Sequence, residues 1–344
     1  MHAADKAVLR LAVGVGLSAF ISYASALPLP FVGCIVTVVL LAKPGPPLPF
    51  VKGMLAAMII AAVLVAGVLM VPVLEHYPLA GVLLTGVLLH AIFSAGKRTA
   101  NAFTTILVIA CTAIPVTALQ NQAMATVLSV HMGVGLAAGV VVSGLMHALF
   151  PDPPAPVKAA PPLAPWHPMQ ATLVVMPVFV LALINPASYV PALVKSVLLG
   201  QQAGGATARS AGRELVGSTV AGAAMAALVW FGLTLRPNLW MLVLWLTAAA
   251  LWAGTRMFGI RPTSWPPSFW ANALVTMFIV LGPAIEDSAA GKDVPSAAAT
   301  RVAVLLGVSL YAWAAVSAFT WMQGRVPRKA PRPAYRPRGP GRLP

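Results

Sequence analysis

Twelve apolar runs, separated by short segments that hold most of the charged residues, make up the greater part of this 344-residue sequence. The runs are roughly 15 to 25 residues long, about the length of helix that crosses a hydrocarbon core of ~30 Å. A chain with 59% hydrophobic and only 8% charged residues cannot cover itself with polar surface in water. Because lipid offers no partner to a free backbone group, and strand-like alternation is absent, the runs predict helices. The predicted fold class is therefore an all-α polytopic membrane protein with about twelve transmembrane helices. The runs cover residues 8–26, 29–42, 53–73, 78–95, 102–119, 124–150, 168–184, 187–200, 214–234, 238–256, 268–284 and 299–322.

The charges between the runs predict the orientation of the chain. With a cytoplasmic N-terminus, most Lys and Arg residues fall on the inside, and the outside keeps few of them together with most of the acidic residues. The positive-inside rule therefore predicts that both termini are cytoplasmic. The inside residues are Lys43, Lys52, Lys97, Arg98, Lys158, Arg209, Arg213, Arg256 and Arg261; the outside ones are Arg236, Lys292 and Arg301, with Glu75, Glu286, Asp287 and Asp293.

The first run also imitates a secretory signal. Lys6 and Arg10 precede the apolar stretch at residues 11–21, and residues 24–26 (ASA) have the small side chains of a cleavage site. Removing this segment would leave the first half of the chain one run short of the second. We therefore expect a retained first helix.

Two segments interrupt the apolar pattern and divide the chain. Residues 151–168 are dense in proline, which fits an extended cytoplasmic linker. Residues 325–344 are rich in Pro and Arg, which predicts a disordered basic tail near anionic headgroups at most. The predicted organisation is a first six-helix half at 1–150, the linker, a second six-helix half at 169–324, and the tail.

The two halves share residues in the same order. Asn101, directly before the fifth run, recurs as Asn272 in the eleventh, with matching residues on both sides. The sixth run aligns with the twelfth, and the second with the eighth, which places Thr37 opposite Lys195. Because each half has an even number of runs, this repeat predicts two parallel six-helix units related by an axis along the membrane normal.

The matched second and eighth runs are short, and each begins at a proline break, at residues 27–30 and at Asn185-Pro186. Paired short, interrupted spans point to a transporter binding site, because the break frees backbone dipoles for a solute. Prolines are also common in membrane helices for structural reasons alone. On the first interpretation, Thr37, Asn185 and Lys195 are candidate substrate-binding residues.

Lys195 is the one basic residue well inside an apolar run. A charge there is costly, so Lys195 either faces a cavity or a partner such as an anionic solute, or extends its amine to the inner headgroups. Asn101 and Asn272, at the starts of paired helices, either cap those helices or join the substrate site.

Glu286 and Asp287 follow Gly282-Pro283 at the outer end of the eleventh run. Two adjacent carboxylates raise each other's proton affinity, which makes the pair a candidate proton-coupling site. We expect Gly282-Pro283 to interrupt the helix and let the pair turn inward. The alternative is an ordinary outer loop with an ion pair to Arg301.

Sequence motifs for enzyme activity, metal binding and nucleic-acid binding are absent from the sequence. The sequence has no Gly-rich phosphate loop, nucleophile elbow or metal-ligand spacing. Cys34 and Cys111 lie in separate apolar runs, and the basic residues lack interleaved aromatic platforms. We therefore expect no enzyme activity, no cofactor, no metal site and no nucleic-acid partner, and an ion gradient as the energy source.

Several motifs occur together: residues 27–31 (LPLPF), 43–47 (KPGPP), 147–153 (HALFPDP), and 282–287 (GPAIED) with 291–293 (GKD) and Arg301. Across nearly all of residues 8–322 the chain resembles a short branch of the fusaric-acid-resistance and aromatic-acid-exporter superfamily of bacterial inner-membrane proteins. The resemblance implies a two-by-six helical fold and efflux of aromatic or other organic acids, often beside a periplasmic adaptor protein of the membrane-fusion type. Longer members carry a cytoplasmic domain after each half, where this chain has an 18-residue linker and a 20-residue tail.

Three functions follow from these observations. The first is an exporter of small organic acids driven by the proton gradient. The second is a passive organic-anion channel, since plant malate channels have a distantly similar six-helix unit. The third is a membrane assembly partner that transports nothing. The expected partners are the lipid bilayer, a small organic anion and a periplasmic adaptor.

Overall fold

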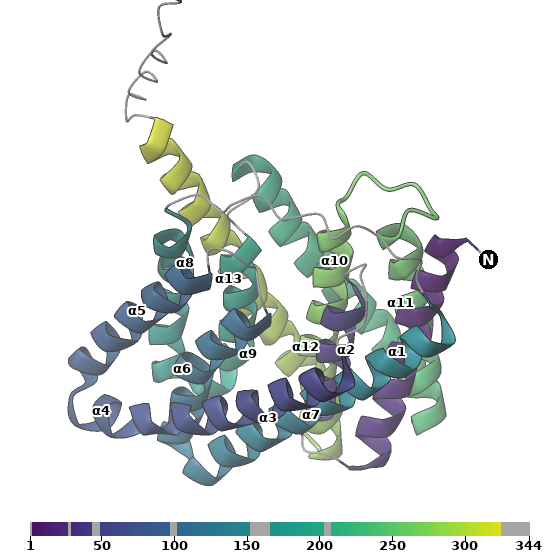
Figure 1. The fold of residues 1–344 in the computed structure, drawn as a ribbon, viewed down its shortest axis with the longest axis horizontal. Coiled ribbons are helices and arrows are strands. Elements are labelled where there is room, and N and C mark those ends of the chain that lie inside the picture. Colours follow the sequence, from purple (N-terminus) through teal and green to yellow (C-terminus); the bar gives the residue numbers. More distant parts are fainter. Residues whose placement is uncertain are drawn as a thin grey trace, which may run out of the picture.

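The computed structural model describes residues 2–26, 29–42, 49–96, 102–151, 166–202 and 208–324. In these ranges the chain forms α-helices and one 3-10 helix, η1, and no strand. The helices pack side by side into one helical body (Figure 1). Every apolar run predicted from the sequence coincides with helix. The elements are α1 (Ala3–Ala24), α2 (Phe31–Leu41), α3 (Phe50–Ala66), η1 (Gly67–Met70), α4 (Val71–His76), α5 (Pro78–Ala95), α6 (Ala102–Gln120), α7 (Gln122–Leu149), α8 (His167–Ile184), α9 (Pro186–Gln202), α10 (Ala208–Leu235), α11 (Leu239–Met257), α12 (Pro267–Ala289) and α13 (Val294–Gly324).

Nine helical segments of the described chain are long and apolar enough to cross a membrane, with α3, η1 and α4 counted together as Phe50–His76. Shorter apolar helices are α2 and the Leu107–Gln120 part of α6. Large apolar side chains such as Val51, Leu69 and Leu79 stand exposed on outer faces, as helices dissolved in lipid require. The prediction of an all-α, multi-pass membrane protein is confirmed, whereas the number twelve stays a prediction.

The helix breaks occur at the predicted prolines. Between α1 and α2, Ala26 and Leu29 adopt positive φ angles of 47° and 58°, and Pro30 occupies the N-cap position of α2. Asn185 ends α8 in a non-helical conformation, and α9 begins at Pro186. Proline lacks the N–H that would continue the preceding helix, so both chain reversals follow from the sequence.

The helix α12 lies in the interior of the bundle. It packs against α10, α11, α13 and α2, and most of its side chains from Phe269 to Ala284 are buried. The expected interruption at Gly282-Pro283 is wrong, because α12 continues through Pro283 to Ala289. Neighbouring helices can support a proline inside a membrane helix even though one backbone hydrogen bond is lost.

Helices that the sequence predicts to be paired by the repeat have corresponding neighbours. The first helix of the chain, α1, packs against α2, α7 and α11. The first helix after the linker, α8, packs against α9, α13 and α5. Likewise α2 contacts α7 and α12, while α9 contacts α13 and α6. Helices before the predicted linker thus pack against helices after it.

A glycine permits the close approach of α10 and α12. A Cβ atom added at Gly222 would lie 2.5 Å from the carbonyl oxygen of Ala273 and 2.5 Å from Cβ of Thr276. Backbone cannot yield as a flexible side chain does, so Gly222→Ala should separate the two helices and lower the free energy of unfolding by about 1 to 3 kcal/mol. Thermal unfolding in detergent measures this change. Gly144→Ala is the matched control, since a Cβ there meets nothing within 4 Å; equal melting temperatures for the two variants would contradict the close packing.

Candidate functional site

Lys195 lies inside the helical bundle, on α9, and is only 3% exposed. Its amine donates hydrogen bonds to Oγ1 of Thr219 on α10, at 2.6 Å, and to Oγ1 of Thr276 on α12, at 2.8 Å. The amine is held by buried hydroxyl groups, so Lys195 does not extend to the headgroups. Its side chain joins three helices of the second half.

The hydroxyl groups around Lys195 are oriented by their own helices. Thr219 donates to the carbonyl of Leu215 at 2.7 Å, and Thr276 donates to the carbonyl of Asn272 at 2.7 Å. With their protons directed to carbonyl groups one turn back, both hydroxyls present lone pairs to the amine. Ser309 on α13 extends the network, with its Oγ 2.9 Å from that of Thr219. Thr219, Thr276 and Ser309 are all at most 1% exposed.

The charge of this site is not balanced by a carboxylate. Among the residues that the structure describes, Lys195 has the two hydroxyl partners and no ion pair. An ammonium group has three N–H donors, so one remains for a further acceptor. The arrangement therefore suits an anion, which would supply both the missing acceptor and the missing charge.

Thr37 and Asn185, the other candidate substrate residues of the short runs, form no hydrogen bond with Lys195 in the described structure. Thr37 is buried on α2 and donates to the carbonyl of Gly33 at 2.9 Å, so hydrogen bonds do not join it to Lys195. Asn185 is exposed at the junction of α8 and α9, where its backbone N–H donates to the carbonyl of Leu181. The break that Asn185 marks was predicted correctly; its role in binding stays a prediction.

The two asparagines of the repeat have different outcomes. Asn272 is buried on α12. Its backbone carbonyl accepts a hydrogen bond from Thr276, which lies one turn later on the same helix and also accepts from Lys195. Asn272 does not cap α12, because that helix begins at Pro267, five residues earlier. The cap interpretation of Asn272 is wrong because Pro267 occupies the first position of the helix, which places Asn272 in the second turn. Asn101 lies outside the described residues.

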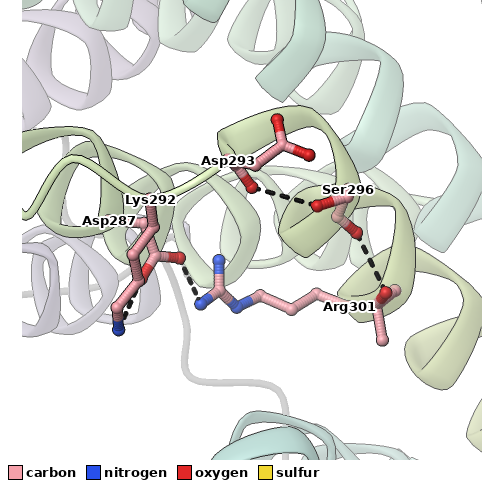
Figure 2. A network of polar contacts seen from close by, with 6 residues as sticks. Asp287, Lys292, Asp293, Ser296 and Arg301 are labelled. Carbon is pink, nitrogen blue, oxygen red and sulfur yellow. Dashed lines mark hydrogen bonds and ion pairs between the residues drawn. The ribbon is translucent and has the colours of Figure 1, made fainter.

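The two carboxylates of the candidate proton-coupling pair lie in different environments, and Figure 2 shows that of Asp287. Asp287 is 7% exposed and forms ion pairs with Arg301, at 2.5 Å, and with Lys292, at 3.4 Å. Glu286, its neighbour on α12, is exposed. The ion pair with Arg301 that the sequence allowed is therefore present, but it starts from the last turns of a helix and not from a loop. It ties the end of α12 to the beginning of α13.

Known families cover part of the chain. Residues 7–149 match a family described as "Protein of unknown function (DUF2955)". The match begins in α1 and ends with the last residue of α7, so it corresponds to the predicted first six-helix half. No curated protein and no solved structure matches the sequence. The resemblance to the fusaric-acid-resistance superfamily stays a prediction.

Two buried side chains of the matched segment are Arg10 and His147, and sequence reasoning missed the burial of Arg10. Arg10 is fully buried, and its Nη1 donates to the carbonyl of Phe150, immediately after α7, at 3.4 Å. A guanidinium is favourable at this negative end of a helix dipole. His147, one turn earlier on α7, is also buried and bonds through Nδ1 to the carbonyl of Ser143 at 2.7 Å. Spacing in the sequence carries no signal for either contact, because the partners are backbone carbonyls.

Proposed function

We propose that the chain is a bacterial inner-membrane efflux transporter for small organic acids, aromatic ones included, and that Lys195 binds the carboxylate of the solute. The observation that carries the proposal is a buried lysine held by hydroxyl groups, with no carboxylate partner among the described residues. The proton gradient supplies the energy, because the sequence lacks a nucleotide-binding motif.

Electrostatics favours an anionic solute at this position. A lysine at the centre of a membrane helix costs about 2.5 to 3.5 kcal/mol on insertion scales. Two hydroxyl oxygens offset part of this cost, but they carry no formal charge. A carboxylate accepts charge-assisted hydrogen bonds and also neutralises the amine, so it binds more strongly than a neutral solute of the same size.

The transport path lies between two parallel six-helix repeats. Support comes from the corresponding contacts that α1 and α8 make with their neighbours, and from those that α2 and α9 make with theirs. Counting α2, α6 and α9 with the nine long segments gives twelve spans, and both termini are then cytoplasmic by the charges of the loops. Helices α2 and α9, which begin at proline breaks, each contact the other half through α12 and α6. A periplasmic membrane-fusion adaptor is the proposed protein partner.

Purified full-length protein in liposomes tests this function. We expect export of 4-hydroxybenzoate that exceeds the leak of empty liposomes when a proton gradient is imposed. A proton ionophore should return the flux to that leak. Flux that persists without the gradient would establish a passive channel instead, and no flux with 4-hydroxybenzoate, benzoate or malate would favour the assembly partner.

A further inference from the structure

An apolar groove opens near the beginning of α10, one to two turns before Thr219 of the Lys195 network, and its lining side chains are different from those of that network. Its volume is about 230 Å³. Val216, Leu310 and Trp313 form its apolar wall, together with Gly212 and Gly217. Two of these side chains face outward, since Leu310 is 48% and Trp313 37% exposed. A groove with exposed apolar walls on a multi-pass membrane protein faces lipid tails.

The guanidinium of Arg213 lies at the edge of this groove. Arg213 lines it, and its guanidinium lies 5.8 Å from the ring centroid of Trp265, which also lines it. Arg213 has no ion pair in the part of the chain that the structure describes. The adjacent Glu214 accepts a hydrogen bond from Ser268. A cation-π contact with an indole leaves the N–H donors of the guanidinium available to an anion, because the contact uses no hydrogen bond.

The position of these residues fits the boundary between headgroups and tails. Arg213 lies in the second turn of α10, and Trp265 lies in the segment between α11 and α12. Trp265 stacks on Phe269 at a centroid distance of 4.4 Å, and Phe269 packs edge to face on Trp270. Clustered tryptophans are typical of the membrane interface, and basic pockets between membrane helices on the cytoplasmic side bind anionic headgroups.

We infer that this groove is a binding site for one anionic phospholipid. The phosphate binds the guanidinium of Arg213, and an acyl chain lies along Val216, Leu310 and Trp313. The charge of Arg213 selects an anionic headgroup over a zwitterionic one. The apolar wall requires a chain, which distinguishes a lipid from a soluble phosphate.

Native mass spectrometry of the full-length protein in detergent tests the site. Phosphatidylglycerol and phosphatidylcholine with the same acyl chains are titrated separately, and the fraction of protein carrying one lipid is measured. We expect tighter binding of phosphatidylglycerol, and about a fivefold loss in Arg213→Gln, because one basic residue contributes about 1 kcal/mol near anionic lipid. Phosphatidylcholine binding should not change in this variant. Val216→Phe, which fills the groove, should weaken binding of both lipids.

Arg236→Gln is the matched control, because Arg236 is also an exposed arginine, directly after the other end of α10, and lies outside the groove. Equal binding of the two lipids by the unmodified protein would overturn the inference. So would equal effects of Arg213→Gln and Arg236→Gln. Glycerol 3-phosphate, a headgroup without chains, is added as competitor at millimolar concentration; displacement of the lipid by it would assign the groove to a soluble anion.

Discussion

Lys195→Met should lower solute flux by about ten- to a hundredfold while the protein stays folded. A hydrogen bond to a charged group contributes about 1.5 to 3 kcal/mol, and each 1.4 kcal/mol is a tenfold change in affinity. Methionine keeps the apolar stem of the side chain but removes the amine. Thr219 and Thr276 retain their bonds to the carbonyls of Leu215 and Asn272, so the change leaves no buried donor without a partner. Initial rates of 4-hydroxybenzoate export give the flux, and thermal unfolding gives the stability.

Lys52→Met is the control for this change, since Lys52 is an exposed lysine on α3. It should leave both flux and melting temperature near those of the unmodified protein. Normal export by Lys195→Met at equal protein amounts would contradict the role of Lys195 as the solute site. Unfolding of Lys195→Met would show instead that the amine stabilises the contact of α9 with α10 and α12.

Asp287→Ala should lower the free energy of unfolding by about 2 to 4 kcal/mol, somewhat below the range for fully buried pairs. The reason is that Asp287 is the shared partner of two cations, and its side chain is only 10% exposed. Arg301→Ala should cost less, because Lys292 still pairs with Asp287. In the double variant both buried charges are absent, so part of the lost stability should return. Thermal unfolding of the four proteins measures this cycle.

The Glu286→Gln variant tests proton coupling without a large change in the stability of the protein. Glu286 is exposed, so the substitution should change stability by less than about 0.5 kcal/mol. Loss of the dependence of export on outside pH in this variant would assign coupling to Glu286.

Additive effects of Asp287→Ala and Arg301→Ala on the free energy of unfolding would contradict the ion pair that Figure 2 shows.

The helices could be predicted from the sequence because membrane helices depend on local properties. Run length and hydropathy located them, and Pro30 and Pro186 marked two of their beginnings. Lys195 could be singled out for the same reason, since a single charge in an apolar run needs a partner wherever the run lies. Its actual partners could not be predicted. Thr219 and Thr276 resemble many other hydroxyl residues that bond to the carbonyl one turn back.

The remaining errors concern contacts that depend on tertiary packing. Pro283 looks like a helix end, but the helices around α12 support it and the helix continues. In the sequence Arg10 is only a basic residue before the apolar stretch at residues 11–21, but in the fold the residue after α7 supplies a carbonyl for it. In both cases the deciding partner is a segment distant in sequence, and a local pattern contains no information about it.

The packing of α1 on α11 has a consequence for how the protein is made. Ribosomes add ~5 to 20 residues per second, and α11 begins only at Leu239, so α1 waits roughly 10 to 50 s for this partner after its own synthesis. The face of α1 that α11 later covers includes Gly16, where an added Cβ would touch Thr247. Until then that face meets lipid or the insertion machinery. The helices before residue 150 therefore enter the membrane before α1 has its full set of neighbours, and α11 supplies the last of them.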